Sequence, residues 1–174
     1  TKAARAADRA DLRALANRPG ADQGVTPSTL LPSRASAAKQ GAGYRFTSTA
    51  ADATIAYTWR PGNGTLDDWT AQIDDGPVWQ PALGGGVTAA LADGQTARCE
   101  GGQATQVTFD ERLQQLTVTW AYPTAGGLTV RWVYGLKGKA LTVAASCAEP
   151  RVAAFSLGHI GGVPLRKSLG VPYL

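Results

Sequence analysis

Hydrophobic and polar residues alternate with a period of two through the segment from Ala104 to Cys147. Side chains on an extended strand point alternately to opposite faces, so this period indicates β-strands with one buried face. The apolar positions of the three clearest runs are Leu116, Val118, Trp120 and Tyr122, then Leu128, Val130, Trp132 and Tyr134, then Leu141, Val143, Ala145 and Cys147. Turn residues at 123–127 and 135–139 separate the runs, and the pattern predicts a meander of three long strands.

Shorter runs of the same kind precede and follow this meander. We expect further strands at 44–49, 54–59, 69–73, 87–91, 95–99 and 151–160, separated by turns rich in Gly, Pro and Asp. The stretch from Trp79 to Gly86 lacks this alternation and is expected to be irregular. Several strands with short turns predict an all-β fold, a large two-sheet antiparallel β-sandwich of the supersandwich type.

The two ends of the chain differ from this pattern. Residues 2–17 are rich in Ala, with Leu12 and Leu15 on one side, and predict one peripheral N-terminal helix that Pro19-Gly20 ends. We therefore divide the chain into a helix and linker (1–43), a β-sandwich domain (44–163) and a connection towards a following domain (164–174). The last segment is apolar where a free terminus is usually polar, which favours a connection.

The net charge of +4 is uneven along the chain. Residues 1–45 carry +5 and the remaining residues carry −1, so the predicted sheets hold no basic face of the kind that binds nucleic acid. No apolar run approaches the roughly 20 residues that span a membrane. The Gly84-Gly85-Gly86 run has no following Lys and is not a phosphate loop, so no cofactor is expected.

The residues that could carry chemistry are few. Two cysteines and one histidine argue against a zinc site, so no metal is expected. Cys99 and Cys147 fit either one disulfide, worth roughly 4 kcal/mol in the chain-entropy model, or two buried thiols. His159 has no second histidine and no nucleophile motif to pair with, so we identify no catalytic residue in this chain.

One cluster of acidic and aromatic residues is a candidate sugar site. The pairs Asp67-Asp68 and Asp74-Asp75 flank Trp69, and Trp79 follows closely. Aromatic faces that stack on sugar rings, beside carboxylates that accept hydrogen bonds from hydroxyls, would bind carbohydrate. We therefore name Trp69, Asp74, Asp75 and Trp79 as candidate carbohydrate-binding residues. The same residues also suit turns and core anchors, and this alternative stays open.

The Trp- and Tyr-rich meander from Leu116 to Cys147, the Gly-rich stretch from Trp79 to Val87 and the strand from Arg151 to Ile160 resemble galactose-mutarotase-like β-sandwich modules. Such modules stand at the N-terminus of many multidomain glycoside hydrolases. The resemblance covers residues 44–174 and implies a module that packs against a catalytic domain following Leu174. Mutarotases use a histidine pair and a glutamate, whereas this chain has only His159, which argues against epimerase activity.

Three functions are compatible with these observations. The first is a non-catalytic domain of a secreted glycoside hydrolase, which shapes a catalytic domain outside this chain and exposes an apolar docking patch. The second is a stand-alone carbohydrate-binding module, with coplanar exposed tryptophans chosen from Trp59, Trp69 and Trp79. The third is a structural or assembly protein, with all five tryptophans in the core and a sheet edge open for pairing.

Overall fold

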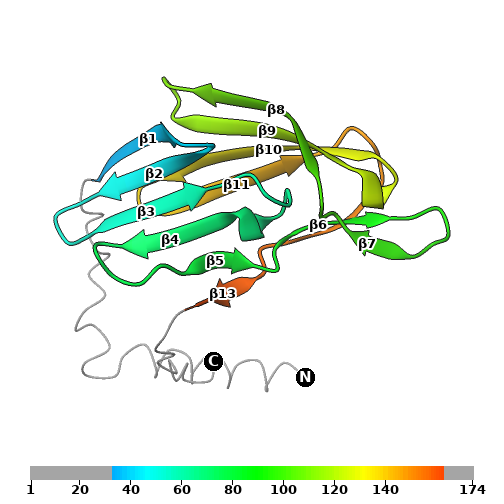
Figure 1. Ribbon diagram of the computed structural model, residues 1–174, viewed down its shortest axis with the longest axis horizontal. Helices are drawn as coiled ribbons and strands as arrows, with labels where there is room; N and C mark the ends of the chain where they lie inside the picture. Colours follow the sequence, from blue (N-terminus) through cyan, green and yellow to red (C-terminus); the bar gives the residue numbers. More distant parts are fainter. Residues whose placement is uncertain (1–32, 163–174) are drawn as a thin grey trace, which may run out of the picture. The chain divides into compact units, whose positions relative to one another are not determined.

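The computed structural model describes residues 33–162, which form strands and two short 3-10 helices, η1 (Leu66–Asp68) and η2 (Pro123–Ala125) (Figure 1). One antiparallel sheet has the order β1-β2-β3-β4, and its strands are β1 (Arg34–Gln40), β2 (Gly43–Thr49), β3 (Thr54–Trp59) and β4 (Trp69–Ile73). A second has the order β11-β10-β9-β8, and its strands are β8 (Gln103–Asp110), β9 (Gln115–Tyr122), β10 (Leu128–Lys137) and β11 (Ala140–Ser146).

Two smaller antiparallel sheets complete the described fold. The three-stranded one has the order β12-β6-β7, formed by β12 (Val152–Ser156), β6 (Gly86–Ala90) and β7 (Thr96–Arg98). The two-stranded one pairs β13 (His159–Gly161) with β5 (Gln80–Leu83). No helix within residues 33–162 has the length and apolar character needed to cross a membrane.

The two four-stranded sheets pack face to face around an aromatic core (Figure 1). Strands β9 and β10 bury every second residue, and the buried positions are those that the period of two predicted. Rings from opposite sheets meet in the centre: Trp59 lies 6.5 Å from Trp120, and Trp69 lies 4.9 Å from Tyr134, between centroids. The predicted all-β antiparallel sandwich is therefore confirmed, with two smaller sheets beside the two that pack face to face.

One segment of the predicted linker is a strand. Residues 34–40 form β1, which pairs with β2 along its whole length. Its sequence shows no hydrophobic alternation because β1 is an edge strand with mostly exposed side chains, of which only Ala37 packs on the core. The boundary predicted at residue 44 is therefore too late. The predicted helix at 2–17 and the predicted connection at 164–174 lie outside the described residues.

The strand predicted at 151–160 is two strands that join different sheets. β12 pairs with β6, and β13 pairs with β5. Gly158 separates them with a φ of +70°, a conformation that non-glycine residues rarely adopt, and a Cβ there would lie 2.3 Å from the carbonyl oxygen of Leu83. The stretch from Trp79 to Gly86, predicted to be irregular, supplies β5 for this pairing.

Candidate functional site

Trp69, the first of the four predicted sugar-binding residues, lies in the core. Strand β4 places Trp69 and Ala71 on the inner face, where the Trp69 side chain is fully buried. Its ring centroid lies 5.6 Å from that of Phe46 and 4.9 Å from that of Tyr134. An aromatic ring must be exposed to stack on a sugar, so Trp69 is a core anchor here and is not available to a ligand.

Asp74 and Asp75 lie in the turn after β4, and both are exposed. Asp74 has a φ of +48°, and its carboxylate accepts a hydrogen bond of 2.8 Å from the backbone N–H of Thr54. Its own N–H donates to the Thr54 carbonyl, also at 2.8 Å. Asp74 therefore closes the end of the β3–β4 pair, which is the turn role that the sequence analysis left open.

Trp79 is only partly buried and packs against the core from the edge of the first sheet. Its backbone pairs with Ala71 through two hydrogen bonds of 2.7 and 2.9 Å. The four predicted residues thus share one β4–β5 segment but do not form one exposed face. The alternation Trp-Thr-Ala-Gln-Ile in β4 was the signal in the sequence that could have placed Trp69 inside.

The neighbouring carboxylate of Asp68 fixes the loop before β4. Its two oxygens accept hydrogen bonds from the N–H groups of Asn63 at 2.8 Å and Gly64 at 2.9 Å. Burial raises the pKa of Asp68 above its ordinary value, although these hydrogen bonds partly oppose that effect. Both oxygens are engaged with the backbone, and this arrangement supports a structural role for Asp68.

Asp67 connects the same loop to β7 and β5. Its carboxylate accepts a charge-assisted hydrogen bond of 2.6 Å from Arg98 and another from the N–H of Gly84. Burial alone would raise the pKa of Asp67, but the Gly84 N–H and the Arg98 guanidinium outweigh it and lower the pKa. Asp67 therefore holds three segments together as a carboxylate.

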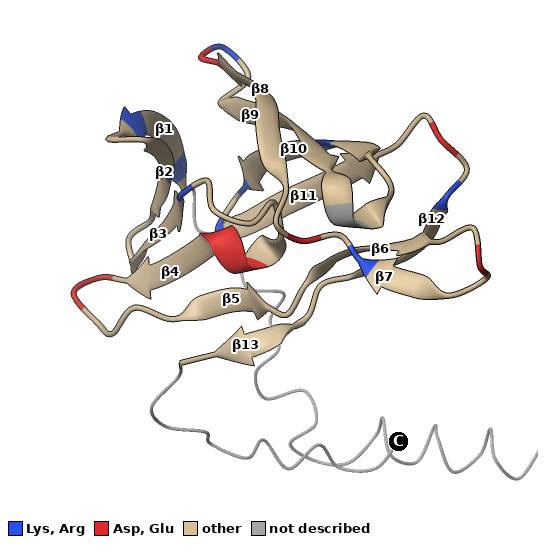
Figure 2. Ribbon diagram, turned by 45° about the vertical axis from the view of Figure 1, so that its right-hand side comes forward, with Lys and Arg blue, Asp and Glu red and all other residues tan. Residues whose placement is uncertain are grey.

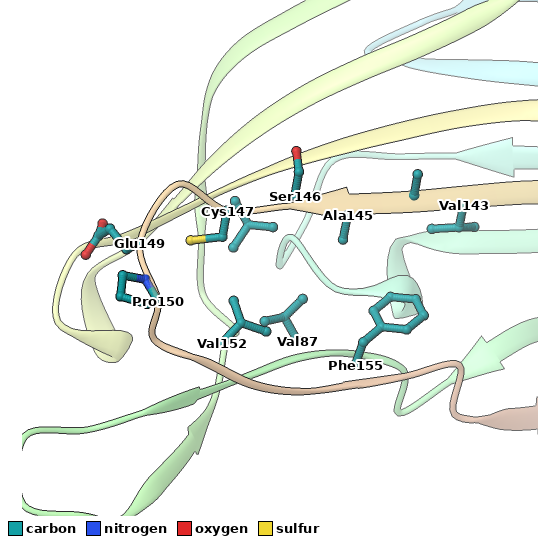
Figure 3. Close-up of a pocket in the computed structure, with 11 residues that line it drawn as sticks. Val87, Val143, Ala145, Ser146, Cys147, Glu149, Pro150, Val152 and Phe155 are labelled. Atoms are coloured by element: carbon teal, nitrogen blue, oxygen red, sulfur yellow. The ribbon is translucent and has the colours of Figure 1, made fainter.

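A large apolar groove lies between β11 and β12 (Figure 3). We call it the β11–β12 groove and define it by Val87, Val130, Val143, Ala145, Val152 and Phe155, which line its apolar part. Its volume is about 860 Å³. Val143 and Ala145 come from β11, and Val152 and Phe155 come from β12, so the groove separates two consecutive strands of the chain.

The groove is open because each of its flanking strands is a sheet edge. β11 pairs with β10 on one side, and β12 pairs with β6 on one side. Within residues 33–162, no strand pairs with the other side of either. Residues 147–151 connect the two strands around the end of the groove (Figure 3). An unpaired edge presents backbone N–H and C=O groups to its surroundings. The walls of the groove can therefore form hydrogen bonds with the backbone of a partner.

The groove carries little charge. Neither β11 nor β12 contains Lys, Arg, Asp or Glu, and Figure 2 shows charged positions mainly in turns and at strand ends. Glu149 lines one end of the groove, where its carboxylate accepts hydrogen bonds from Arg151. Arg151 also donates to the carbonyl oxygen of Ala125 at 3.2 Å, which fixes the connecting loop. The groove is therefore suited to contact with an apolar surface of another molecule.

Exposed hydrophobic residues concentrate in the same part of the chain. Eight large hydrophobic side chains are exposed within residues 33–162, and four of them lie in the nine residues from 152 to 160. These four are Val152, Phe155, Leu157 and Ile160. A globular domain rarely exposes contiguous apolar surface unless that surface meets a partner. The sequence predicts an exposed apolar patch without a position for it, because a strand pattern does not show which edges stay unpaired.

The other residues singled out in the sequence form no second site. His159 is exposed on β13, next to Gly84. Among the described residues, no group of three His, Cys, Asp or Glu side chains could hold a metal ion. Cys99 is buried and Cys147 is partly buried, and no bond joins their sulfur atoms in this structure.

Comparisons of the chain with protein-family models, with curated proteins and with solved structures found no match. The likeness to galactose-mutarotase-like modules therefore stays a prediction from the sequence pattern.

Proposed function

We propose that this protein is a non-catalytic interaction domain that packs against another protein domain through the β11–β12 groove. The observation that carries the proposal is the open apolar groove between two unpaired strand edges. Burial of apolar surface is the main favourable term in protein association, and unpaired edges add main-chain hydrogen bonds to it. Charged pairs lie outside the apolar part of the groove, so a partner meets few desolvation costs there.

The resemblance noted in the sequence supplies the class of partner. We propose a catalytic domain of a secreted glycoside hydrolase, which would act on an oligo- or polysaccharide while this domain supports it. An assembly protein without enzymatic partner is the second candidate, favoured by the burial of Trp59, Trp69, Trp120 and Trp132 together with the open edges. The burial of these four tryptophans argues against a carbohydrate-binding module, because they provide no exposed coplanar aromatic surface.

Photo-crosslinking tests this proposal. The experiment uses the full-length protein that the natural gene encodes. A benzoylphenylalanine at position 155 replaces an aromatic side chain that lines the groove and is 46% exposed. We expect its crosslinks, mapped by mass spectrometry, to reach a folded domain other than residues 33–162. The matched control carries the same group at Leu113, which is also exposed but lies in the turn between β8 and β9.

Crosslinks from position 155 to residues 1–32, to residues 163–174 or to a second copy of the chain would overturn docking of another domain. The same holds if positions 155 and 113 give the same crosslinks. Hydrolysis of chromogenic glycosides by the isolated chain would overturn its non-catalytic role. Glycosidase activity in the crosslinked partner would favour the glycoside hydrolase as partner, and its absence would favour the assembly protein.

A further inference from the structure

Cys99 lies directly opposite Val87 across the β6–β7 pair. Thr88 pairs with Arg98, and the next position continues this register, with the N–H of Cys99 donating to the Val87 carbonyl at 2.8 Å. Residues opposite each other in an antiparallel pair project from the same face of the sheet. The side chain of Cys99 therefore lies on the face of Val87, which lines the groove, and it is almost fully buried.

Cys147 lines the same groove from the β11 side. It follows the last residue of β11, lines the groove together with Val87, and packs against the core that contains Cys99 (Figure 3). Cys147 is partly exposed, whereas Cys99 is not. Cys147 and Val87, the residue opposite Cys99, thus line one groove, and Cys147 lies near enough to Cys99 to raise the pKa of its thiol, although 47 residues separate the two cysteines in the chain.

We infer that Cys99 and Cys147 form a disulfide under oxidising conditions, and that this bond fastens the wall of the groove formed by β11 to the β12-β6-β7 sheet. Within the described residues, the two sheets meet at this point through packing and through the hydrogen bonds of Arg151 to the Ala125 and Gly126 carbonyls. A covalent link here fixes the separation of the two groove walls. The bond itself rests on the fold, and its effect on docking rests on the proposed function.

The chemistry is thiol–disulfide exchange with a low-molecular-weight disulfide such as oxidised glutathione. The Cys147 thiolate attacks one sulfur of that disulfide, forms a mixed disulfide and releases one glutathione thiolate. The Cys99 thiolate then attacks the Cys147 sulfur and releases the second. The protein loses two protons and two electrons in total, and the oxidant is reduced to two thiols.

Exposure sets the order of these two steps. Burial raises the pKa of the Cys99 thiol, and the neighbouring Cys147 raises it further, whereas Arg151 opposes both effects. The thiolate is the attacking species, so the less buried Cys147 reacts first and Cys99 resolves the mixed disulfide. The reverse order would require a bulky disulfide to reach a buried sulfur.

Mass spectrometry of the full chain, incubated with oxidised or reduced glutathione, tests the inference. We expect oxidation to remove the mass of two hydrogen atoms and to leave one crosslinked peptide pair that contains Cys99 and Cys147. Since the bond closes a long loop of the unfolded chain, we expect the Tm to rise by on the order of 10 °C. Cys147→Ser, whose side chain is partly exposed, should fold and lose both effects.

Two results would overturn the inference. One is alkylation of both thiols in the oxidised protein, and the other is a glutathione adduct on Cys147 that persists because Cys99 does not resolve it. The consequence for docking has its own readout, the crosslinking yield from position 155 in the oxidised and reduced protein, which we expect to differ. A confirmed disulfide with an unchanged yield would reject the effect on docking and keep the bond.

Discussion

At the scale of single residues, the buried hydroxyl of Tyr122 is satisfied by partners from two other segments. The hydroxyl of Tyr122 donates to the carbonyl oxygen of Gly64 and accepts the indole N–H of Trp132 at 3.1 Å. All three groups lie inside the sandwich, where an unsatisfied donor or acceptor costs more than a hydrogen bond usually contributes. These contacts explain why a tyrosine stands at the end of a strand of apolar inner residues.

Tyr122→Phe should lower the free energy of unfolding by about 1–3 kcal/mol, because the Gly64 carbonyl and the Trp132 indole both lose a buried partner. Urea unfolding measures the change. The matched control is Tyr44→Phe, since Tyr44 is partly buried and stacks on Phe109, while its hydroxyl makes no hydrogen bond within residues 33–162. Equal losses in the two variants would contradict this account.

Asp67→Asn should lower the free energy of unfolding by about 1 kcal/mol near neutral pH, a small value because Arg98 is partly exposed. The pKa of Asp67 is lower in the folded protein than in the unfolded chain. Its contribution is therefore present above the unfolded pKa of about 4 and is lost as the pH falls through the folded value. Urea unfolding of both proteins from pH 7 to pH 2 measures this.

The stability difference between wild type and Asp67→Asn should shrink as the pH falls. The same comparison in an Arg98→Met background separates the ion pair from the hydrogen bond to Gly84. A difference that grows towards low pH would show that the pKa of Asp67 is not lowered by folding.

At the scale of elements, the sequence predicted strands and their buried faces best where hydrophobic and polar residues alternate strongly. The inner faces of β9 and β10 follow the apolar positions one by one, and their burial confirms them. β1 escaped prediction because an edge strand buries little, and β5 escaped because it has four residues and no alternation. β1 and β5 are strands because they pair with β2 and β13, and the sequences of β1 and β5 do not indicate this pairing.

Gly43→Ala should disrupt the pairing of β2 with β3. A Cβ at this position would lie 1.9 Å from the carbonyl oxygen of Trp59, which is backbone and cannot rotate away. We expect a loss of about 3 kcal/mol or more in the free energy of unfolding, measured by thermal or urea unfolding. Gly41→Ala is the control, since a Cβ there meets nothing within 4 Å and only its φ of +60° opposes the change.

The control variant should lose only about 1 kcal/mol, the cost of a non-glycine residue at positive φ. If Gly41→Ala lowers the free energy of unfolding more than Gly43→Ala does, the close approach of the β2 and β3 backbones is not the reason for glycine at position 43.

At the scale of the whole described fold, one core holds the two large sheets together, while the β11–β12 groove stays open at its side. Trp59, Trp69, Trp120 and Trp132 are almost fully buried, and Trp79 is the one tryptophan that is partly buried. This distribution favours packing against a partner over sugar binding, because the described fold exposes an apolar groove and no coplanar pair of tryptophans.

Acrylamide quenching of tryptophan fluorescence checks this distribution. We expect weak quenching of the folded chain, because quenching requires collision with an accessible ring. Trp79→Phe should remove most of the accessible component, whereas Trp132→Phe should leave it in place, since the Trp132 ring is fully buried. Strong quenching that survives Trp79→Phe would mean that a second tryptophan is exposed, and would restore the carbohydrate-binding alternative.

The sequence by itself determined the all-β class, the long strands of the meander and the residues on their inner faces. That information is local, because a period of two depends only on neighbours along one strand. Only the tertiary structure decided that residues 34–40 extend a sheet and that Trp69 anchors the core. It also decided that β11 and β12 each keep one unpaired edge, and that Cys147 lines the same groove as Val87, the residue opposite Cys99. These outcomes depend on which distant strands pair, and no single strand's pattern encodes its partner.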